Sequence, residues 1–506
     1  MKTRLHPVAS LLAGAAACCL LSGPALAATF DGAARSWSYA HAAQGSFLAE
    51  IVAYDSSQST LWVAGVTGVD VLDARTGTLV QRIDTRAFGS INSVAIHGGV
   101  AAMAFEAPVR TAAGVVALFD TGTRSPLGGI STITVGALPD MVTFTPDGSK
   151  LLVANEATPL VYGTLTSAAG VFPRQYGPAA VDPVGSVSII DMASRTVSAT
   201  ATFAGVAQSG SFLRTGTGMD FEPEYIAVNA AGTKAYVSVQ EANGIGVLNL
   251  QTGLFESLIG LGAKDFNAAG NRIDPLNNNS PALVNVPVKG LYQPDGIAAY
   301  SVAGKTYLVM ANEGDFREDD ADRSAANNLG AVAPLNALRV LNTESSAGNL
   351  FAAGGRSFSI RDENGVLVYD SGEILDREAI AAGIYNDGRS RDKGVEPEGV
   401  ELLAIGDRTF AFVGLERTLK SSLAVFDITD PMDVRFERLL ISNGDVSPEG
   451  LKGYVLDGAY YMAFANEVSN TTSVFRLASV PEPGSLALVA LAAAAAGVVS
   501  RRSKRG

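Results

Sequence analysis

The stretch PDMVTFTPDGSKLLVANE, residues 139–156, contains two short apolar segments separated by a turn. The acidic Asp140 stands at the start of the first segment, and Glu156 follows the second. The triplet Pro-Asp-Gly at 146–148 is typical of a β-hairpin, because Gly tolerates the backbone conformations that tight turns require. We therefore predict a two-stranded hairpin with a carboxylate at both of its open ends.

The same pattern recurs along the chain, and a third and often a fourth short strand follow it. Four more clear copies lie at 223–241, 294–313, 397–416 and 448–467, and two weaker copies lie at 50–68 and 92–106. Several short strands per repeat, without a long amphipathic helix, are typical of a propeller blade. The sequence predicts an all-β fold over residues 28–479, a seven-bladed β-propeller of antiparallel four-stranded blades. Because the first two copies are weak, the predicted number of blades could differ by one.

Two features of the spacing refine this prediction. The last repeat lacks a fourth strand, and we expect residues 29–41 to supply it and to close the ring. A simple blade takes about 40 to 50 residues, so the three longer intervals contain insertions, which we place at 159–184, 263–289 and 316–355. Within the last of these, the acidic run at 318–322 lacks the glycine and the ligand spacing of an EF-hand, and we interpret it as a solvated loop.

The N-terminus has the features of a signal peptide at 1–27. A charged start, an apolar run at 8–21 and the small residues Ala25 and Ala27 predict export and removal by signal peptidase after Ala27. Cys18 and Cys19 are the two cysteines of the chain, so the predicted mature protein has no disulfide. The residues before them do not fit a lipoprotein signal.

The C-terminus, residues 480–506, combines Pro481-Glu482-Pro483, an uncharged and mostly apolar run at 486–499, and a basic end. This order resembles the PEP-CTERM sorting signal of Gram-negative bacteria that make exopolysaccharide. The resemblance implies transient membrane insertion and processing by an exosortase near the Pro-Glu-Pro. As a helix the apolar run would span about 21 Å. It is therefore short for a permanent anchor, which needs roughly 20 residues. An ordinary C-terminal membrane helix is the alternative.

A second resemblance covers residues 47–477. The segments NEGDFRED at 312–319, RSFSIRDENGVLVYDSG at 356–372 and EPEGVELLAIGDRTFAFVGLERT at 396–418 are similar to the choice-of-anchor I domain family. The family implies a bacterial, extracellular, propeller-like domain, and some relatives are labelled alkaline phosphatases. Relatives often carry two consecutive acids where this chain has Arg391-Asp392, which argues against transferring a metal site to that loop.

Composition narrows the range of functions. The formal net charge is −13, and such a surface repels nucleic acids and attracts cations. After the predicted cleavage the histidines are His41 and His97, and the chain contains no HExxH, GxSxG or phosphate-loop motif. Catalysis, if present, would have to use a metal ion or paired carboxylates.

The repeats predict the position of a site. A hairpin returns its second strand to the end where the first began, so each repeat directs two acids toward one mouth of the central channel. Calcium suits such a ring because it accepts six to eight oxygen ligands with loose geometry. The alternative is that these acids only join neighbouring blades through hydrogen bonds. The candidate metal ligands are Asp140, Glu156, Glu224, Glu241, Asp295, Glu313, Glu398, Glu416, Glu449 and Glu467, with Glu50 and Glu106 from the weaker repeats.

Two functions follow from this pattern. The first is a non-enzymatic module at the cell surface or in the exopolysaccharide layer, which binds cations at its acidic mouth and a glycan or surface protein through its insertions. The second is a calcium-dependent phosphoesterase, with metal and arginine holding a phosphate. Its candidate catalytic residues are Glu398, Glu416, Arg389, Lys393 and Arg417. Simple charge neutralisation of the acids is the alternative role for these basic residues.

Overall fold

The computed structural model describes residues 30, 32–41, 47–317 and 322–477. Ala25, Ala27 and the Pro481-Glu482-Pro483 triplet therefore lie outside the described residues. The described chain is mostly β-structure, with one α-helix, α1 (Ile374–Ala381). No described helix has the length and apolar character needed to cross a bilayer.

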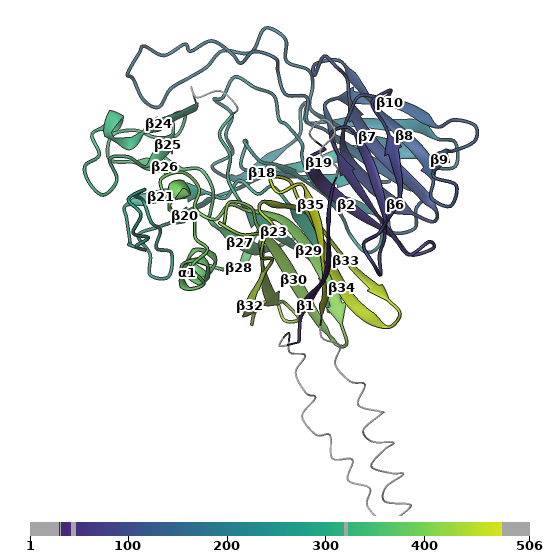
Figure 1. Ribbon diagram of the computed structural model, residues 1–506. Coiled ribbons are helices and arrows are strands. Elements are labelled where there is room, and N and C mark those ends of the chain that lie inside the picture. The colour runs from purple at the N-terminus through teal and green to yellow at the C-terminus, as the bar shows by residue number, and fades with distance from the viewer. Residues whose placement is uncertain (1–29, 31, 42–46, 318–321, 478–506) are drawn as a thin grey trace, which may run out of the picture. The chain divides into compact units, whose positions relative to one another are not determined.

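Seven of the described sheets have four or five strands (Figure 1). The first four, in order of pairing, are β2 (Ala49–Asp55), β3 (Thr60–Gly65), β4 (Gly68–Asp73), β5 (Leu79–Asp84); β6 (Ser90–His97), β7 (Val100–Glu106), β8 (Ala113–Asp120), β10 (Thr132–Ala137), with β9 (Ser125–Pro126) beside β8; β11 (Pro139–Phe144), β12 (Lys150–Asn155), β13 (Ser186–Asp191), β14 (Thr196–Thr202); and β16 (Ile226–Val228), β17 (Lys234–Val239), β18 (Gly244–Asn249), β19 (Leu254–Leu261), β15 (Gln208–Ser211). The remaining three are β22 (Ile297–Val302), β23 (Lys305–Asn312), β27 (Ser357–Asp362), β28 (Leu367–Asp370); β29 (Pro397–Ile405), β30 (Arg408–Leu415), β31 (Ser422–Asp427), β32 (Arg435–Ile441); and β33 (Pro448–Leu456), β34 (Ala459–Asn466), β35 (Thr471–Leu477), β1 (Ala34–Ala40).

The hairpins that open these sheets are those predicted from the sequence. In the third sheet, Gly148 occupies the turn at φ +69°, a conformation that favours glycine. In the fifth sheet the third strand, β27, follows the long insertion and pairs with β23. The N-terminal β1 pairs antiparallel with β35 and so forms the fourth strand of the last sheet.

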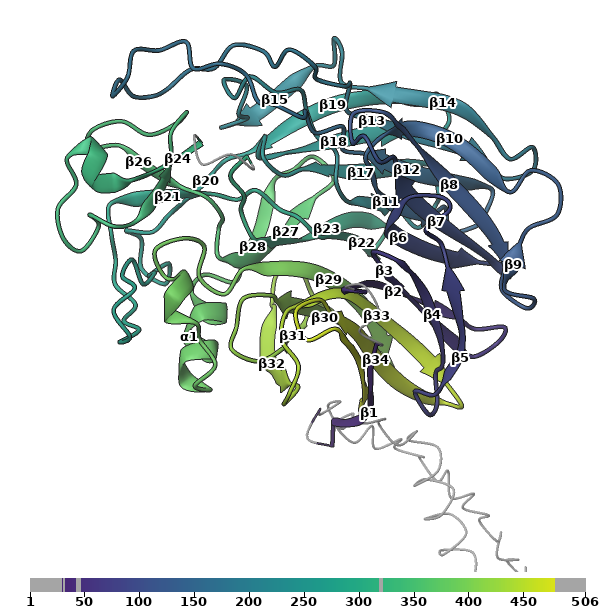
Figure 2. The same cartoon turned by 45° about the horizontal axis from the view of Figure 1, so that its top comes forward.

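The first strands of the sheets contact one another in sequence. β2 contacts β6, β6 contacts β11, β11 contacts β16, β16 contacts β22, β22 contacts β29, β29 contacts β33, and β33 contacts β2. Figure 2 shows these first strands near the centre of the domain that residues 30–477 form, with the later strands farther out. We call the space that the first strands border the central channel.

The middle strands are buried because neighbouring sheets pack face to face. Every residue of β3 is buried, whereas β14, a fourth strand, alternates between exposed and covered positions. Between the first two sheets, Trp62 packs with Phe105 and Met103, all three fully buried. Each side chain of this size contributes about 1.5–3 kcal/mol by burial, so the apolar runs of the repeats account for the contacts between sheets.

Two of the predicted insertions build small sheets of their own. One contains β20 (Ala263–Asp265), β21 (Val288–Leu291) and β26 (Leu350–Ala352), and the other β24 (Arg323–Ala325) and β25 (Arg339–Leu341). They share an apolar core that includes Phe266 and Leu338. Asp322 is buried beside this unit, so its assignment to a solvated loop was wrong. The rest of that acidic run lies outside the described residues.

Candidate functional site

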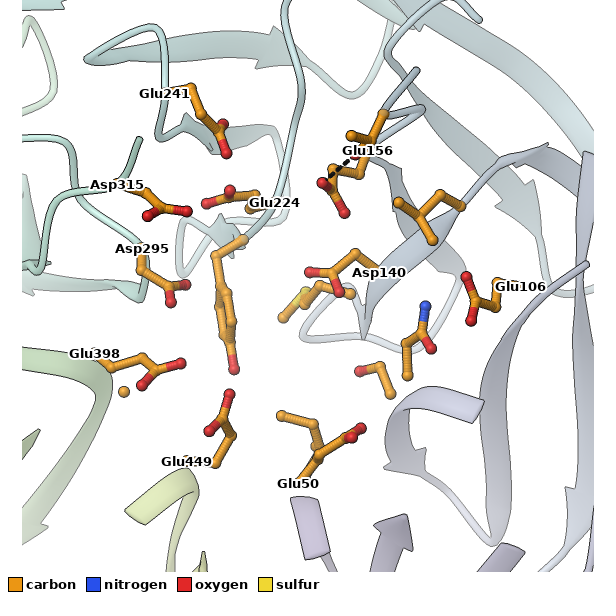
Figure 3. A pocket seen from close by; sticks show the side chains of 18 of the residues that line it. Glu50, Glu106, Asp140, Glu156, Glu224, Glu241, Asp295, Asp315, Glu398 and Glu449 are labelled. Atoms are coloured by element: carbon orange, nitrogen blue, oxygen red, sulfur yellow. Dashed lines mark hydrogen bonds between the residues drawn. The ribbon is translucent and has the colours of Figure 1, made fainter. Parts of the chain in front are cut away.

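A pocket of about 400 Å³ lies at one end of the central channel, and acidic side chains dominate its wall. Arg110 is the basic residue among the described residues that line it. Figure 3 shows the carboxylates pointing into one space from separate sheets. The ten acidic residues of this lining are Glu50, Glu106, Asp140, Glu156, Glu224, Glu241, Asp295, Asp315, Glu398 and Glu449. We call this cavity the acidic pocket.

In five of the seven sheets, the residue that lines the pocket at the start of the first strand lies in an irregularity of that strand. In the third sheet, Pro139 pairs with Asn155 and Val142 pairs with Val153, so the residues between them form a bulge that contains Asp140. A bulge bends the strand and re-aims a side chain. The pairing shifts in the same way around Glu50, Asn92, Glu398 and Glu449.

Proline precedes the acid in the five strong repeats and fits this position. It cannot donate to a strand ladder, and is tolerated at the first residue of a strand or at a bulge. In the third sheet, Pro139 is the first residue of β11. The sequence Pro-acid therefore marks the point where the first strand meets the pocket.

The acids that end the second strands divide into two groups. Glu106, Glu156 and Glu241 line the pocket, and Thr158 donates a hydrogen bond to Glu156. The other three, Glu313, Glu416 and Glu467, were also predicted to face the pocket, but they are absent from its described lining.

Basic residues hold two of these three acids. Lys393 Nζ lies 2.5 Å from Glu313 and 3.2 Å from Glu396, while Arg417 lies 2.7 Å from Glu416. Glu313, Glu396 and Lys393 are all less than a tenth exposed. This cluster lies between the fifth and sixth sheets and neutralises acids that would otherwise add to the pocket charge. Burial raises the pKa of Glu449, and the charge of the nearby Glu467 adds to this effect.

The candidate catalytic residues do come together in space. Arg389 lies 2.5 Å from Glu396, and Glu398 and Glu416 contribute oxygens to a group with Glu449 in which these atoms are within 4.8 Å of one another. Arg389, Lys393 and Arg417 are, however, all engaged with carboxylates. The arrangement therefore matches the charge-neutralising role weighed for these basic residues.

The sequence analysis did not identify several residues of the site. Asp315 lines the pocket, and Glu396 joins the Lys393 cluster. Both adjoin strands that were predicted, at Asn312-Glu313-Gly314-Asp315 and at Glu396-Pro397, so an acid count at strand ends could have found them. Tyr162 and Arg110 come from loops outside the repeat pattern, where no periodic signal exists.

Burial and mutual repulsion raise the pKa of the pocket acids. Burial is the larger cause, and it raises the pKa of Glu50 to about 9 and that of Asp140 to about 8, with neighbouring carboxylates adding to the effect. The pKa values of Glu224, Asp295 and Glu398 are raised well above the ordinary range for the same two reasons. Protons or cations must therefore offset the charge of this pocket.

Glu396 shows the opposite behaviour. Its burial raises the pKa, but the adjacent Lys393 and Arg389 outweigh burial and leave the pKa below its usual value. The contrast between the two regions arises from the placement of basic side chains, since both regions are buried.

The acidic pocket has the donor chemistry of a site for a hard cation. Oε2 of Glu224, Glu241 and Glu398 is buried and has no hydrogen-bond partner among the described residues. Carboxylate oxygens are the preferred ligands of calcium. The group Glu398, Glu416 and Glu449 could hold an ion at the pocket, whereas the group Glu313, Glu396 and Glu416 already contains the ammonium of Lys393.

Comparison with protein families agrees with this architecture. The model described as Choice-of-anchor I domain matches residues 50–431. The chain belongs to the choice-of-anchor I domain family. A second model, the PEP-CTERM protein-sorting motif, matches residues 479–505. A choice-of-anchor I domain with this motif indicates an exported, cell-surface-targeted protein that exosortase-type machinery processes.

Comparison with solved structures supports a propeller-like fold for this choice-of-anchor I protein. One similar structure is Kuenenia stuttgartiensis Hydrazine Synthase, with 12% sequence identity and a TM-score of 0.52. The match covers 87% of this chain and 98% of that chain. At this identity the likeness concerns the fold alone. A search of curated protein sequences finds no match.

Proposed function

We propose that this protein is an exported, non-catalytic binding module that holds calcium or a similar hard cation in its acidic pocket. The observation that carries the proposal is the convergence of ten carboxylates on one pocket of about 400 Å³. Ions of like charge repel one another in a buried site, and a divalent cation with loose coordination relieves that repulsion. The buried oxygens without partners provide ligand atoms.

We also propose that this module is a seven-bladed propeller and that β1 closes its ring. The pairing of β1 with β35 and the closed series of contacts among first strands support it. Pairing the first and last segments of the chain in one sheet protects edges that would otherwise be open. In this arrangement the cation would also link the blades, because its ligands come from several sheets.

The proposed setting is the envelope of a Gram-negative bacterium. Signal peptidase would remove residues 1–27, and exosortase would act near Pro481-Glu482-Pro483 after transient membrane insertion. The processed protein would then associate with exopolysaccharide or with another surface protein. The matched sorting motif supports this route.

Calcium binding tests the proposal directly. Isothermal titration of the metal-stripped full chain with calcium should show saturable binding, and Asp140→Asn should weaken it by about tenfold or more through loss of an ionised ligand. The matched control is Asp407→Asn, which changes an exposed residue in the turn between β29 and β30. Equal calcium affinity for the two variants, or no binding by the unmodified chain, would contradict the proposal.

The phosphoesterase alternative has less support, because the basic residues that it requires already pair with carboxylates. A phosphomonoester assay with calcium, and again with a chelator, separates the two proposals. We expect no calcium-dependent turnover. Turnover that Glu398→Gln and Glu416→Gln abolish would establish the hydrolase instead.

A further inference from the structure

An open depression of about 620 Å³ adjoins the acidic pocket and shares Glu106 and Arg110 with it. Its wall comes from the turn after β3, the segment before β6 and the loop after β7. These segments lie at the pocket end of their strands, because Ser90 pairs with Glu106 and Gly65 pairs with the residue before Glu50. The depression therefore opens beside the pocket, on the same side of the domain.

This depression is mostly uncharged, unlike the pocket. Val66, Ala107 and Pro108 form its apolar part. Its two arginines are balanced by Glu106 and by the exposed acid that pairs with Arg86. A ligand that extends from the pocket into this space would therefore contact carboxylates at one end and an apolar surface at the other.

Exposed valines stand next to the pocket in three of the sheets. Val109 is 59% exposed and precedes Arg110, and Val161 is 69% exposed and precedes the pocket residue Tyr162. Val468 is 59% exposed in the turn after β34, at the pocket end of the last sheet. Single apolar residues on a surface are common, whereas apolar residues gathered around one site indicate a binding surface.

A lysine of this protein shows that an ammonium group fits among acids of this kind. Nζ of Lys393 lies 2.5 Å from Glu313 and 3.5 Å from Asp315, and Asp315 also lines the pocket. Glu313 follows the second strand of its sheet, as Glu156 does in the third sheet. Glu156 lines the pocket, and the described lining contains no lysine. A lysine from a partner could therefore take in the pocket the role that Lys393 has beside it.

We propose that the pocket and the depression together bind a segment of another protein, which inserts a lysine side chain among the carboxylates and packs apolar side chains in the depression. The buried Oε2 atoms of Glu224, Glu241 and Glu398 have no partner among the described residues and would accept hydrogen bonds from the ammonium. This recognition rests on the proposed role of the pocket as a binding site, but it does not require calcium. Since both cations neutralise the same acids, calcium and the partner should compete.

Three matched peptides test this recognition on the full chain in a nonionic detergent with chelator. The probes are Leu-Lys-Leu-Lys-Leu, Ser-Lys-Ser-Lys-Ser and Leu-Gln-Leu-Gln-Leu, each with blocked ends and a neutral dye whose anisotropy reports binding. We expect the first peptide to bind and the other two to bind at least about tenfold more weakly, because each lacks one of the two kinds of contact. Equal affinity of the three peptides, or no binding of the first, would overturn the proposal.

Variants of the protein show where the first peptide binds. Glu156→Gln should weaken its binding by about threefold or more, whereas Glu363→Gln, an exposed residue in the turn after β27, should leave it unchanged. Val66→Ser and Val109→Ser should each weaken it by about threefold. Their control is Val455→Ser, which lies near the far end of β33 and is 51% exposed in the native chain. Losses no larger than those of the controls would place the peptide elsewhere and contradict the proposal.

Calcium and a cationic sugar separate this proposal from its alternatives. Saturating calcium should weaken the first peptide about tenfold or more, and an unchanged affinity in a sample that binds calcium would overturn the proposal. If the chain bound the peptide but no calcium, the proposed function would fail in its choice of cation while lysine recognition would stand. A glucosamine tetramer that bound more tightly than the first peptide and was insensitive to Val109→Ser would show that the pocket serves a polysaccharide instead of a protein.

Discussion

Nζ of Lys393 lies 2.5 Å from Oε1 of Glu313, and both residues are 7% exposed. Burial raises the pKa of Glu313 and Lys393 opposes that effect, which leaves the pKa at about 7. The ammonium also lies 3.2 Å from Glu396. Lys393 thus neutralises carboxylates between the fifth and sixth sheets, as a bound cation would in the acidic pocket.

Replacing this lysine should destabilise the protein and make its stability depend on calcium. Lys393→Met leaves Glu313 buried without its cation, whereas Glu396 keeps its pair with Arg389. Removing one partner of a buried ion pair costs about 3–5 kcal/mol. Because ligand oxygens of Glu313, Glu396 and Glu416 lie within 4.8 Å of one another, calcium should recover part of the loss. Urea unfolding with chelator and with calcium measures both effects.

Lys305→Met is the control for that variant. Lys305 is exposed and is the first residue of β23, so its replacement should change the free energy of unfolding by no more than about 0.5 kcal/mol. If Lys393→Met were as stable as the unmodified chain in chelator, the buried ammonium would not be needed to neutralise the cluster.

The raised pKa values predict how stability depends on pH. Asp140 has a pKa of about 8 in the folded chain against an ordinary value of 3.8, and Glu50 has a pKa of about 9 against 4.5. The folded state therefore binds protons that the unfolded state has released. This contribution to stability is fully present below about pH 4 and is lost as pH rises toward 8 to 9.

Unfolding in chelator at pH 5 and at pH 8 measures this contribution. We expect the pocket acids to lower stability at the higher pH, and calcium to restore it there more than at pH 5. Asp140→Asn should flatten the profile, because an amide does not titrate. A calcium effect of the same size at both pH values would argue against pocket carboxylates as the ligands.

Much of the fold could be predicted because the repeats contain strong local signals. The Gly turns, the apolar runs and the acid positions define the hairpins, as in residues 139–156. The pairing of β1 with β35 followed from a strand missing in the last repeat. The small sheets within the insertions were not predicted, because strands of three or four residues, such as β20 and β21, are too short to show a period.

The site was predictable in outline for the same reason. Acids at the starts and ends of hairpins converge once the strands are antiparallel. The sequence did not show that Glu313 and Glu416 would be held by Lys393 and Arg417 instead of lining the pocket. That distinction depends on loop conformations near 389–396, which carry no periodic pattern.

His41 connects the first and last sheets, and its removal should lower the stability of the protein. Its Nδ1 lies 2.8 Å from Asp70 in the first sheet, and its Nε2 lies 2.8 Å from Thr472 in the last sheet. All three side chains are at most 5% exposed. His41→Ala removes the imidazole that bonds the buried Thr472 hydroxyl and one of the partners of Asp70, which keeps Arg82, and should cost about 2–4 kcal/mol.

Thermal unfolding measured beside a second histidine variant checks that effect. His97 packs partly exposed against Phe144 at the end of β6, and His97→Ala should lower the melting temperature much less. Similar losses for the two variants would mean that the contacts of His41 do not specially stabilise the junction between the first and last sheets.

Arg214 connects the fourth sheet to the unit built by the insertions, and its loss should act locally. Nη2 of Arg214 lies 2.8 Å from Asp322, and Nε lies 2.9 Å from Glu344; Arg214 is 2% exposed and Asp322 is fully buried. Arg214 and Asp322 are far apart in sequence, so no local sequence pattern predicts that they pair. Arg214→Met leaves Asp322 buried without its cation and should destabilise its surroundings by about 3–5 kcal/mol.

Hydrogen exchange shows where that energy is lost. Amides of β24 and β25 should exchange faster in Arg214→Met, while those of β12 and β34 keep their protection, because the insertions have an apolar core of their own. Arg86→Met is the control, since the side chains of its pair with Asp84 are 72% and 57% exposed and solvent screens such a pair. Faster exchange in every sheet would show that the ion pair stabilises the whole domain, and unchanged exchange at β24 would show that it holds nothing in place.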